Sequence, residues 1–427
     1  MEAHQLGHFR ITLNKEGAKE YVKVGFPIRY GLFSEIETED TLFQFNLNGE
    51  IKFIQGRGIH GLPPAEWLKR TLGNDWVYYS AGDYQGFHNL IGEYYYPYLS
   101  YSSNSILEGD PFGERPVQLA MESLQKVWTE IKERISPPMP RNLHDFLKAV
   151  LEKDEETLSQ RARHFHELIG GPVTVLPPDT RHVDYNVIPL TIADGCLYNC
   201  GFCHVKSGRN FVPRSRENIV EQMMNLKRFY GQDLPNYNSL FLGQHDALHA
   251  GLDLLQFAAA KGYELFEFKR SYLKKAYLFL FGSVDSFLQS QEKLFESINC
   301  LPYLTYVNIG LESADPATLS SLKKPLSAEK VGEAFSRVGE VNRRYENIEV
   351  TVNFVFGNDL PLTHFDSLFD LLARRWVPSR NKGALYLSPL VGGGMKERER
   401  RKELVRKFNQ LKIESHLPTF IYLIQRL

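Results

Sequence analysis

The chain is poor in cysteine: only four of its 427 residues are Cys. A disulfide framework needs paired cysteines spread over a small secreted domain, so disulfides are excluded as the main source of stability. The first residues, MEAHQLGHFRITLNKEG, contain neither a basic region nor an apolar run, so we expect no export signal and a cytoplasmic location. In a reducing compartment, cysteines that lie close together indicate metal binding or catalysis.

Two other features are missing. No apolar run approaches the roughly 18 residues needed to cross a bilayer, so we expect no transmembrane segment. The 50 basic and 51 acidic residues nearly cancel, whereas a dedicated nucleic-acid binder usually carries a basic excess. Nucleic acid is therefore an unlikely partner. The charged stretch 396–412 reads as a solvated helix.

The first 171 residues change character part-way. Residues 1–115 are rich in strand patterns, and Asn48-Gly49 between alternating apolar residues predicts a type I′ hairpin. Residues 115–135 have the period of an amphipathic helix, and two further helices are expected within 142–169. We therefore expect a β-rich N-terminal domain (1–115) followed by a helical connector (116–171).

From residue 187 onward, short apolar strands alternate with helical stretches. This pattern predicts a parallel sheet covered by helices, either doubly wound or closed incompletely into a barrel. We favour an α/β fold with a partial (βα)6 TIM-type barrel over 172–395 and a helical C-terminal extension over 396–427. Ligands of either fold bind at the carboxyl ends of the strands. The expected strands cover residues 187–193, 238–243, 276–282, 306–312, 349–357 and 384–389.

Three of the four cysteines fall in the loop after the first of these strands. Cys196, Cys200 and Cys203 have the spacing C-x3-C-x2-C. Closely spaced thiolates suit an iron–sulfur cluster, and three ligands for four irons leave one iron open to a small molecule. A structural zinc site would need a fourth ligand, for which His204 is the available neighbour.

This motif, with the aromatic Phe202 before the last cysteine, resembles the radical SAM superfamily. Later segments resemble the branch that contains the Elongator catalytic subunit, the methylthiotransferases and oxygen-independent coproporphyrinogen oxidase. The resemblance spans about residues 186–395 and implies an oxygen-sensitive enzyme with a [4Fe-4S] cluster and S-adenosylmethionine (SAM) as cofactors. One electron from an external donor, such as flavodoxin or ferredoxin, would yield methionine and a 5′-deoxyadenosyl radical that abstracts a substrate hydrogen.

The same resemblance implies a set of SAM contacts. Gly243 and Gln244 in LFLGQHDAL would meet the methionine amino group, and Glu312 or Ser313 the methionyl or ribose end. Lys324 would face the SAM carboxylate. Asn353 stands where relatives often have a ribose-binding Asp, and Gly357 would let the adenine approach. No catalytic residue is singled out.

Several other features carry both a functional and a plain structural interpretation. His245 and His249, if helical, would lie on one face and could bind a metal, although packing beside the SAM pocket is favoured. Gly392–Gly394 could admit a phosphate or adenine, but a flexible connection is favoured. Eight tyrosines within 78–101 could line a pocket, or pack across strands, which is favoured.

Cys300 is expected to be a small buried apolar residue, which leaves too few cysteines for an auxiliary cluster and argues against methylthiotransferase chemistry. Our first hypothesis is a radical SAM enzyme acting on a small metabolite or lipid precursor. The alternative is an RNA-modifying radical SAM enzyme, which the balanced charge disfavours.

Overall fold

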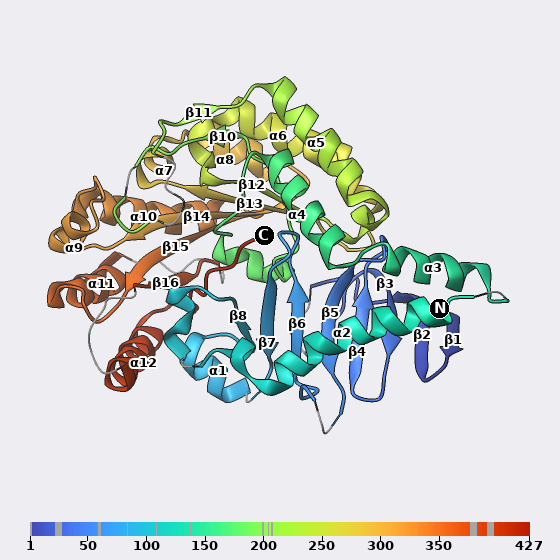
Figure 1. Ribbon diagram of the computed structural model, residues 1–427. Helices are drawn as coiled ribbons and strands as arrows, with labels where there is room; N and C mark the ends of the chain where they lie inside the picture. Colours follow the sequence, from blue (N-terminus) through green and yellow to red (C-terminus); the bar gives the residue numbers. More distant parts are fainter. Residues whose placement is uncertain are drawn as a thin grey trace.

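The computed structural model describes residues 2–21, 28–58, 61–82, 84–107, 109–136, 138–198, 200–203, 205, 208–375, 382–390 and 397–427. These residues form an N-terminal antiparallel sheet and a helix-covered parallel sheet, joined by helices (Figure 1). The chain therefore folds into the two kinds of sheet that its two sequence patterns predict.

The N-terminal sheet is an antiparallel meander of eight strands in sequence order. Helix α2 (Arg115–Arg134) lies across it and buries Val117, Leu124 and Ile131 (Figure 1). Helix α1 (Tyr84–Ile91) lies between the last two strands in the sequence. The strands are β1 (Glu2–Leu6), β2 (Phe9–Glu16), β3 (Leu32–Glu37), β4 (Thr41–Phe45), β5 (Ile51–Gly56), β6 (Glu66–Arg70), β7 (Trp76–Ser80) and β8 (Tyr96–Tyr98).

The hairpin between β4 and β5 is present, but its turn differs from the sequence prediction. A type I′ turn needs positive φ at both central residues. Gly49 has φ +78°, whereas Asn48 does not lie in the positive region. The Gly49 amide donates to the Asn46 carbonyl at 3.0 Å, so the connection is a longer loop with one left-handed residue. The type I′ prediction is therefore wrong.

The tyrosine-rich segment 78–101 packs within this N-terminal region. Tyr79 stacks between Trp67 and Tyr95, with ring centroids 5.3 and 5.6 Å apart. Tyr96 stacks on Phe87 at 5.5 Å. The cross-strand packing interpretation is therefore confirmed for Tyr79 and Tyr95, while Tyr96 packs against helix α1.

Two helices connect the sheets: α3 (Arg141–Leu151) and α4 (Glu155–Ile169). Asp154 caps the start of α4 by accepting from the Thr157 amide, and Gly170 ends it in the left-handed conformation at φ +84°. The chain then runs through a 3-10 helix, η3 (Pro178–Val183), into the second sheet.

All six strands expected after residue 187 are present and pair in parallel. The sheet order is β17-β16-β15-β14-β13-β12-β9, with β9 (Ile188–Pro189), β12 (Ser239–Asp246), β13 (Tyr277–Gly282), β14 (Leu304–Glu312), β15 (Ile348–Phe356), β16 (Leu385–Pro389) and β17 (Thr419–Ile421). This is the predicted open barrel of parallel strands, with a seventh strand added at its edge.

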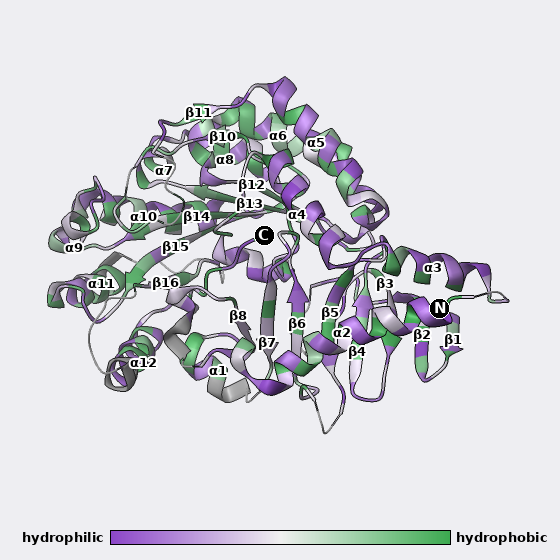
Figure 2. Ribbon diagram, in the orientation of Figure 1, coloured by the Kyte–Doolittle hydropathy of each residue, from purple (hydrophilic) through white to green (hydrophobic). Residues whose placement is uncertain are grey.

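Helices cover the outside of this sheet: α5 (Arg216–Tyr230), α6 (Leu252–Leu265), α7 (Val284–Gln289), α8 (Glu292–Asn299), α9 (Pro316–Ser321), α10 (Ala328–Arg344), α11 (Leu362–Arg375) and α12 (Glu397–Glu414) (Figure 1). Figure 2 shows mainly hydrophobic colour along the central strands and mixed colour on the helices. Continuous apolar strands are the expected pattern for a parallel sheet buried on both faces.

The C-terminal segment is helical only in part. Helix α12 buries Phe408 and Leu411 and is therefore not solvated all round. After β17, the chain runs beside residues 173–176, where the Leu176 amide donates to the Gln425 carbonyl at 2.9 Å. The expectation of a purely helical extension missed this strand, which lengthens the barrel sheet.

Candidate functional site

The loop that carries the three cysteines is closed at its base by a short β-ladder. Strand β10 (Ala193–Asp194) pairs antiparallel with β11 (Val212–Pro213). Arg214 donates two hydrogen bonds to the carboxylate of Asp194, at 2.8 and 2.7 Å. Gly195 follows at φ +76°, where an added Cβ would lie 2.1 Å from the Asn210 carbonyl oxygen. This position therefore requires glycine, and the loop leaves the barrel at a fixed point.

The three cysteines are free and partly or fully buried, whereas Cys300 is exposed, so the expectation that it is buried is wrong. Burial raises the pKa of the Cys200 thiol to about 11 and raises that of Cys203, while the Lys324 ammonium works against both shifts. The Val205 amide donates to the Cys203 sulfur at 3.3 Å. Without a metal these two thiols are therefore neutral at physiological pH, and thiolate ligation would release protons.

The three cysteines line one cavity of about 370 Å³. It lies at the carboxyl ends of the parallel strands, where ligands of such folds bind. Its wall consists of Val175, Cys196, Leu197, Tyr198, Cys200, Phe202, Cys203, Val205, Gly208, Arg209, Asn210, Gln244, His245, Asp246, Phe281, Gly282, Ser283, Gly310, Glu312, Lys324, Asn353, Ser388, Pro389, Leu390, Tyr422 and Ile424.

The end of β12 carries two polar side chains, Gln244 and Asp246, which differ in how many of their polar atoms are hydrogen-bonded. The Gln244 amide is occupied: its oxygen accepts from the Thr174 amide at 2.8 Å, and its nitrogen donates to the Pro172 carbonyl at 2.9 Å. One oxygen of Asp246 accepts from the Ser283 amide and the Ser286 hydroxyl, at 3.0 and 2.7 Å.

The other oxygen of Asp246, Oδ2, has no hydrogen-bond partner among the described residues, although Asp246 is only 4% exposed. The ladder with β13 shifts register between Phe241 and Asp246. Irregularities of this kind commonly re-aim a side chain beside a functional site. A buried carboxylate oxygen without a donor is costly, so this atom of the cavity wall is available to a ligand.

The end of β14 carries a buried ion pair. Lys324 Nζ donates to Glu312 Oε1 at 3.0 Å and to the Gly310 carbonyl at 2.7 Å. Glu312 has φ +66°, an uncommon conformation for a residue with a side chain and one that occurs at binding sites. The Ser313 hydroxyl is used elsewhere, since it accepts from the Asp315 amide at 3.0 Å and bonds His364 Nδ1 at 2.8 Å.

The amide of Asn353 on β15 is paired with that of Asn308 on β14. Each amide nitrogen donates to the oxygen of the other, at 2.7 and 3.2 Å. Asn308 also donates to the Thr351 hydroxyl, which in turn donates to Asp179 at 2.6 Å. This buried chain of hydrogen bonds fixes the orientation of Asn353 at the cavity wall.

The structure brings most of the sequence-predicted site residues together. The three cysteines, Phe202, Gln244, Glu312, Lys324 and Asn353 all line the cavity. Gly243, Ser313 and Gly357 are not among its lining residues, although Gly243 has φ +75° and leaves room above its backbone. An added Cβ at Gly357 would lie 3.2 Å from the Leu390 carbonyl oxygen.

The histidine pair does not have the predicted arrangement. His245 lies in β12, whereas His249 lies in a following 3-10 helix, η5 (Ala247–Ala250), so they do not share one helical face. The extended backbone at His245 overrides the helical spacing. His204 and Gly392–Gly394 lie outside the described residues.

Among the cavity residues that sequence reasoning did not single out, Asp246, Tyr198 and Tyr422 carry polar groups. Asp246 is the last residue of β12, and an acid at a strand end is a recognisable signal. Tyr198 lies inside the cysteine motif without a pattern of its own. Tyr422 reaches the cavity through β17, about 220 residues after the motif, which no local pattern indicates.

The comparison with protein families agrees with this geometry. The model of the radical SAM superfamily matches residues 190–372. Residues 190–372 therefore form a radical SAM domain. Enzymes with this domain use a [4Fe-4S] cluster and SAM.

Among curated proteins, the chain is 25% identical over 183 residues to the ribosomal protein uS12 methylthiotransferase RimO of Psychrobacter sp. (strain PRwf-1). The match covers 39% of this chain and 32% of that protein, so the chain spans about a third of the length of this relative.

Solved structures give weaker similarities. Methylornithine synthase (PylB) is 10% identical with a TM-score of 0.35, covering 75% of this chain and 77% of that one. The FeFe-hydrogenase maturase HydG from Carboxydothermus hydrogenoformans is 13% identical with a TM-score of 0.34, covering 70% and 64%.

The residues present fit the cluster. Three free thiols, with an ammonium group near two of them, form the soft donor set that iron–sulfur clusters use. Among the described residues, no three Cys, His, Asp or Glu side chains gather closely enough to hold one metal ion. In a cubane each cysteine binds a different iron, so this separation does not conflict with a cluster.

Within the described residues, no helix is long and apolar enough to cross a membrane.

Proposed function

We propose that the chain binds the cluster through Cys196, Cys200 and Cys203 and binds SAM across the carboxyl ends of β12 to β15. One observation supports this most strongly: the three thiols open into the same cavity as the polar ends of these neighbouring strands. When bound, the reduced cluster supplies the electron that converts SAM into methionine and a 5′-deoxyadenosyl radical.

Both charged groups of the methionine part of SAM have a suitable partner in the cavity wall. Asp246 Oδ2 would accept from the ammonium group of SAM, and Lys324 would donate to its carboxylate. Lys324 already donates to Glu312, so we propose that the lysine lies between the carboxylate of Glu312 and the carboxylate of SAM when SAM is bound.

The ribose and adenine would lie farther along the sheet. Asn353 has both amide groups paired with Asn308 but keeps a free lone pair on its oxygen, which can accept from a ribose hydroxyl. The backbone at Gly357, beside Leu390, is the proposed approach for the adenine.

The apolar part of the cavity wall favours a small substrate with an apolar portion. Val175, Tyr422 and Ile424 supply hydrocarbon or aromatic surface to this wall. Such a wall excludes water from the reactive centre, which protects a radical from side reactions. We therefore propose a metabolite or lipid-like substrate, with the electron delivered by an external donor protein.

Two other activities are less well supported. The name of the curated relative describes methylthio transfer to a ribosomal protein, but this chain has only Cys300 beyond the cluster motif, so it lacks a second cysteine set. An RNA substrate is the second candidate, because the core resembles Elongator. The nearly neutral charge balance gives it no support.

The experiment that tests the proposal is anaerobic reconstitution with iron and sulfide, followed by dithionite and SAM. We expect 5′-deoxyadenosine in the wild type and none in Cys200→Ser. An intact cluster without 5′-deoxyadenosine would contradict the proposal. Binding to bulk tRNA, titrated with salt, separates the substrate classes, because phosphate contacts weaken steeply as salt rises.

A further inference from the structure

Tyr198 lies between the first two cysteines of the motif. Its side chain contacts the cavity on one side and Asp285 on the other. Its ring lines the cavity, and the Lys324 ammonium lies 5.8 Å from the ring centroid. Its hydroxyl donates to Asp285 Oδ2 at 2.5 Å and accepts from the Asp285 amide at 3.1 Å. A phenylalanine would fill the same wall, so the two hydrogen bonds are what the hydroxyl adds.

Asp285 is itself held in place. It lies in the first turn of α7, and its other carboxylate oxygen accepts from Lys330 of α10 at 2.8 Å. The neighbouring Ser283 caps α7 and donates its amide to Asp246. The hydroxyl of Tyr198 is thus attached to a helix start that two other elements, α10 and β12, also hold.

The loop has two further attachments through its backbone. The Cys196 amide donates to the Arg209 carbonyl at 3.3 Å, and the Gly201 amide donates to the Leu322 carbonyl at 2.8 Å. Tyr198 adds a side-chain attachment between these points, two residues before the buried Cys200. Small displacements of this stretch would move the sulfurs of Cys196 and Cys200 relative to that of Cys203.

We propose that Tyr198 is a positioning residue for the cluster: its hydroxyl, anchored on Asp285, sets the separation of the three cysteine sulfurs. This inference rests on the proposed function, since it assumes that these cysteines hold the cluster. It adds that a residue outside the ligand set determines how firmly the cluster is seated.

The test is Tyr198→Phe in the reconstituted protein. We expect iron to be lost to a chelator about tenfold faster than from the wild type, as the loss of one or two hydrogen bonds implies. The electron paramagnetic resonance (EPR) signal of the reduced cluster should broaden, because the loop then samples more than one arrangement. A role in folding alone would leave the shape of this signal unchanged.

The matched control is Tyr303→Phe, which removes a buried hydroxyl bonded to the Ala259 carbonyl at 2.9 Å and does not touch the cavity. It should retain iron and signal shape. Lys330→Met leaves Tyr198 intact but frees one oxygen of Asp285, so a smaller effect in the same direction is expected. If Tyr198→Phe does not fold, iron loss and the EPR signal of Lys330→Met test the inference instead, and wild-type values for both would overturn it.

Iron loss within twofold of the wild type and an unchanged signal in Tyr198→Phe would overturn the inference. If the wild type itself takes up no cluster, the proposed function fails instead. The two failures are therefore distinguishable.

Discussion

At the residue scale, Asp246 is the least satisfied group in the cavity wall. Its Oδ1 is bound twice by serines, while its Oδ2 has no donor among the described residues. An ordinary structural acid would have both oxygens paired or solvated. The simplest account is that a bound ligand supplies the missing donor.

Asp246→Asn tests this account. The amide oxygen can still accept from Ser283 and Ser286, so the fold should be kept, but the amide group would meet the SAM ammonium without a negative charge. A charge-assisted hydrogen bond is worth about 1.5–3 kcal/mol, so the Kd for SAM should rise roughly 10- to 100-fold. Equilibrium dialysis with reconstituted protein measures this. Ser286→Ala is the control, since it removes a donor to the paired oxygen only. Wild-type affinity in Asp246→Asn would contradict the assignment.

A second residue-scale prediction concerns Glu349 on β15. Burial, together with the nearby charge of Asp179, raises its pKa from 4.5 to about 7. Between these values the folded state binds more protons than the unfolded state, so stability falls as pH rises through this window. In Glu349→Gln the free energy of unfolding should fall less steeply with pH than in the wild type. At pH 8 this variant should be more stable than the wild type by on the order of 2 kcal/mol.

Urea unfolding at pH 5, 6, 7 and 8 measures this difference for Glu349→Gln. Glu346→Gln, at an exposed acid before the strand, should behave like the wild type. Parallel pH profiles for the wild type and Glu349→Gln would refute the burial argument.

At the element scale, the C-terminal strand and its continuation complete the cavity. Strand β17 pairs with β16, and the following residues place Tyr422 and Ile424 in the cavity wall. Asn104 is fully buried and holds this stretch through both backbone groups of Ile424, each at 2.8 Å. One side chain from the N-terminal region thus fixes an element of the site.

Asn104→Ala should release this stretch. It leaves the Ile424 amide and carbonyl without their partners, at a cost of about 2–3 kcal/mol. Hydrogen exchange followed by mass spectrometry should show faster exchange in residues 419–427 of the variant than in the same residues of the wild type. Exchange in β14 should be the same in both proteins. Asn142→Ala, at an exposed asparagine, is the control. Unchanged exchange in 419–427 would show that Asn104 does not hold the segment.

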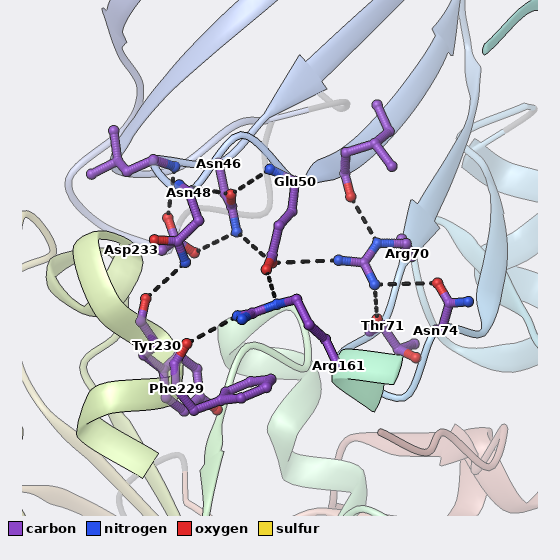
Figure 3. Close-up of polar contacts among 12 residues, drawn as sticks. Asn46, Asn48, Glu50, Arg70, Thr71, Asn74, Arg161, Phe229, Tyr230 and Asp233 are labelled. Atoms are coloured by element: carbon purple, nitrogen blue, oxygen red, sulfur yellow. Dashed lines mark hydrogen bonds and ion pairs between the residues drawn. The ribbon is translucent and has the colours of Figure 1, made fainter. Parts of the chain in front are cut away.

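At the scale of the whole molecule, a buried polar network joins the two sheets (Figure 3). Asn46, in the turn between β4 and β5, donates to Asp233 at 3.2 Å and to Glu50 at 3.0 Å. Glu50 also pairs with Arg70 of β6 and with Arg161 of α4. The network therefore links the N-terminal sheet, the connecting helices and the barrel at one point.

Glu50→Gln should destabilise this junction, because it leaves the buried guanidinium group of Arg70 and the half-buried one of Arg161 without their shared anion. Removing one partner of a buried pair costs about 3–5 kcal/mol, and we expect a loss of this order in denaturant unfolding. Glu296→Gln, which breaks an exposed pair with Arg344, should have little effect. Stability of Glu50→Gln equal to that of the wild type would mean that the junction is held by apolar contacts alone.

The sequence allowed prediction of the parallel strands and of the cysteine loop, because apolar runs and close cysteine spacing are local signals. It did not reveal that Tyr198 is anchored on Asp285, 87 residues later, or that Asn104 holds Ile424. Such contacts depend on how distant elements meet. The turn at Asn48-Gly49 shows a local limit as well, since its geometry is set by docking onto the barrel through Asn46.

The central claim is that the three cysteines hold a cluster with an iron open to SAM. EPR spectroscopy of the reconstituted, dithionite-reduced protein before and after SAM addition tests it most directly. The account predicts a [4Fe-4S] signal that shifts when SAM binds and is lost in Cys200→Ser. A cluster signal that SAM leaves unchanged, or that survives in Cys200→Ser, would contradict it.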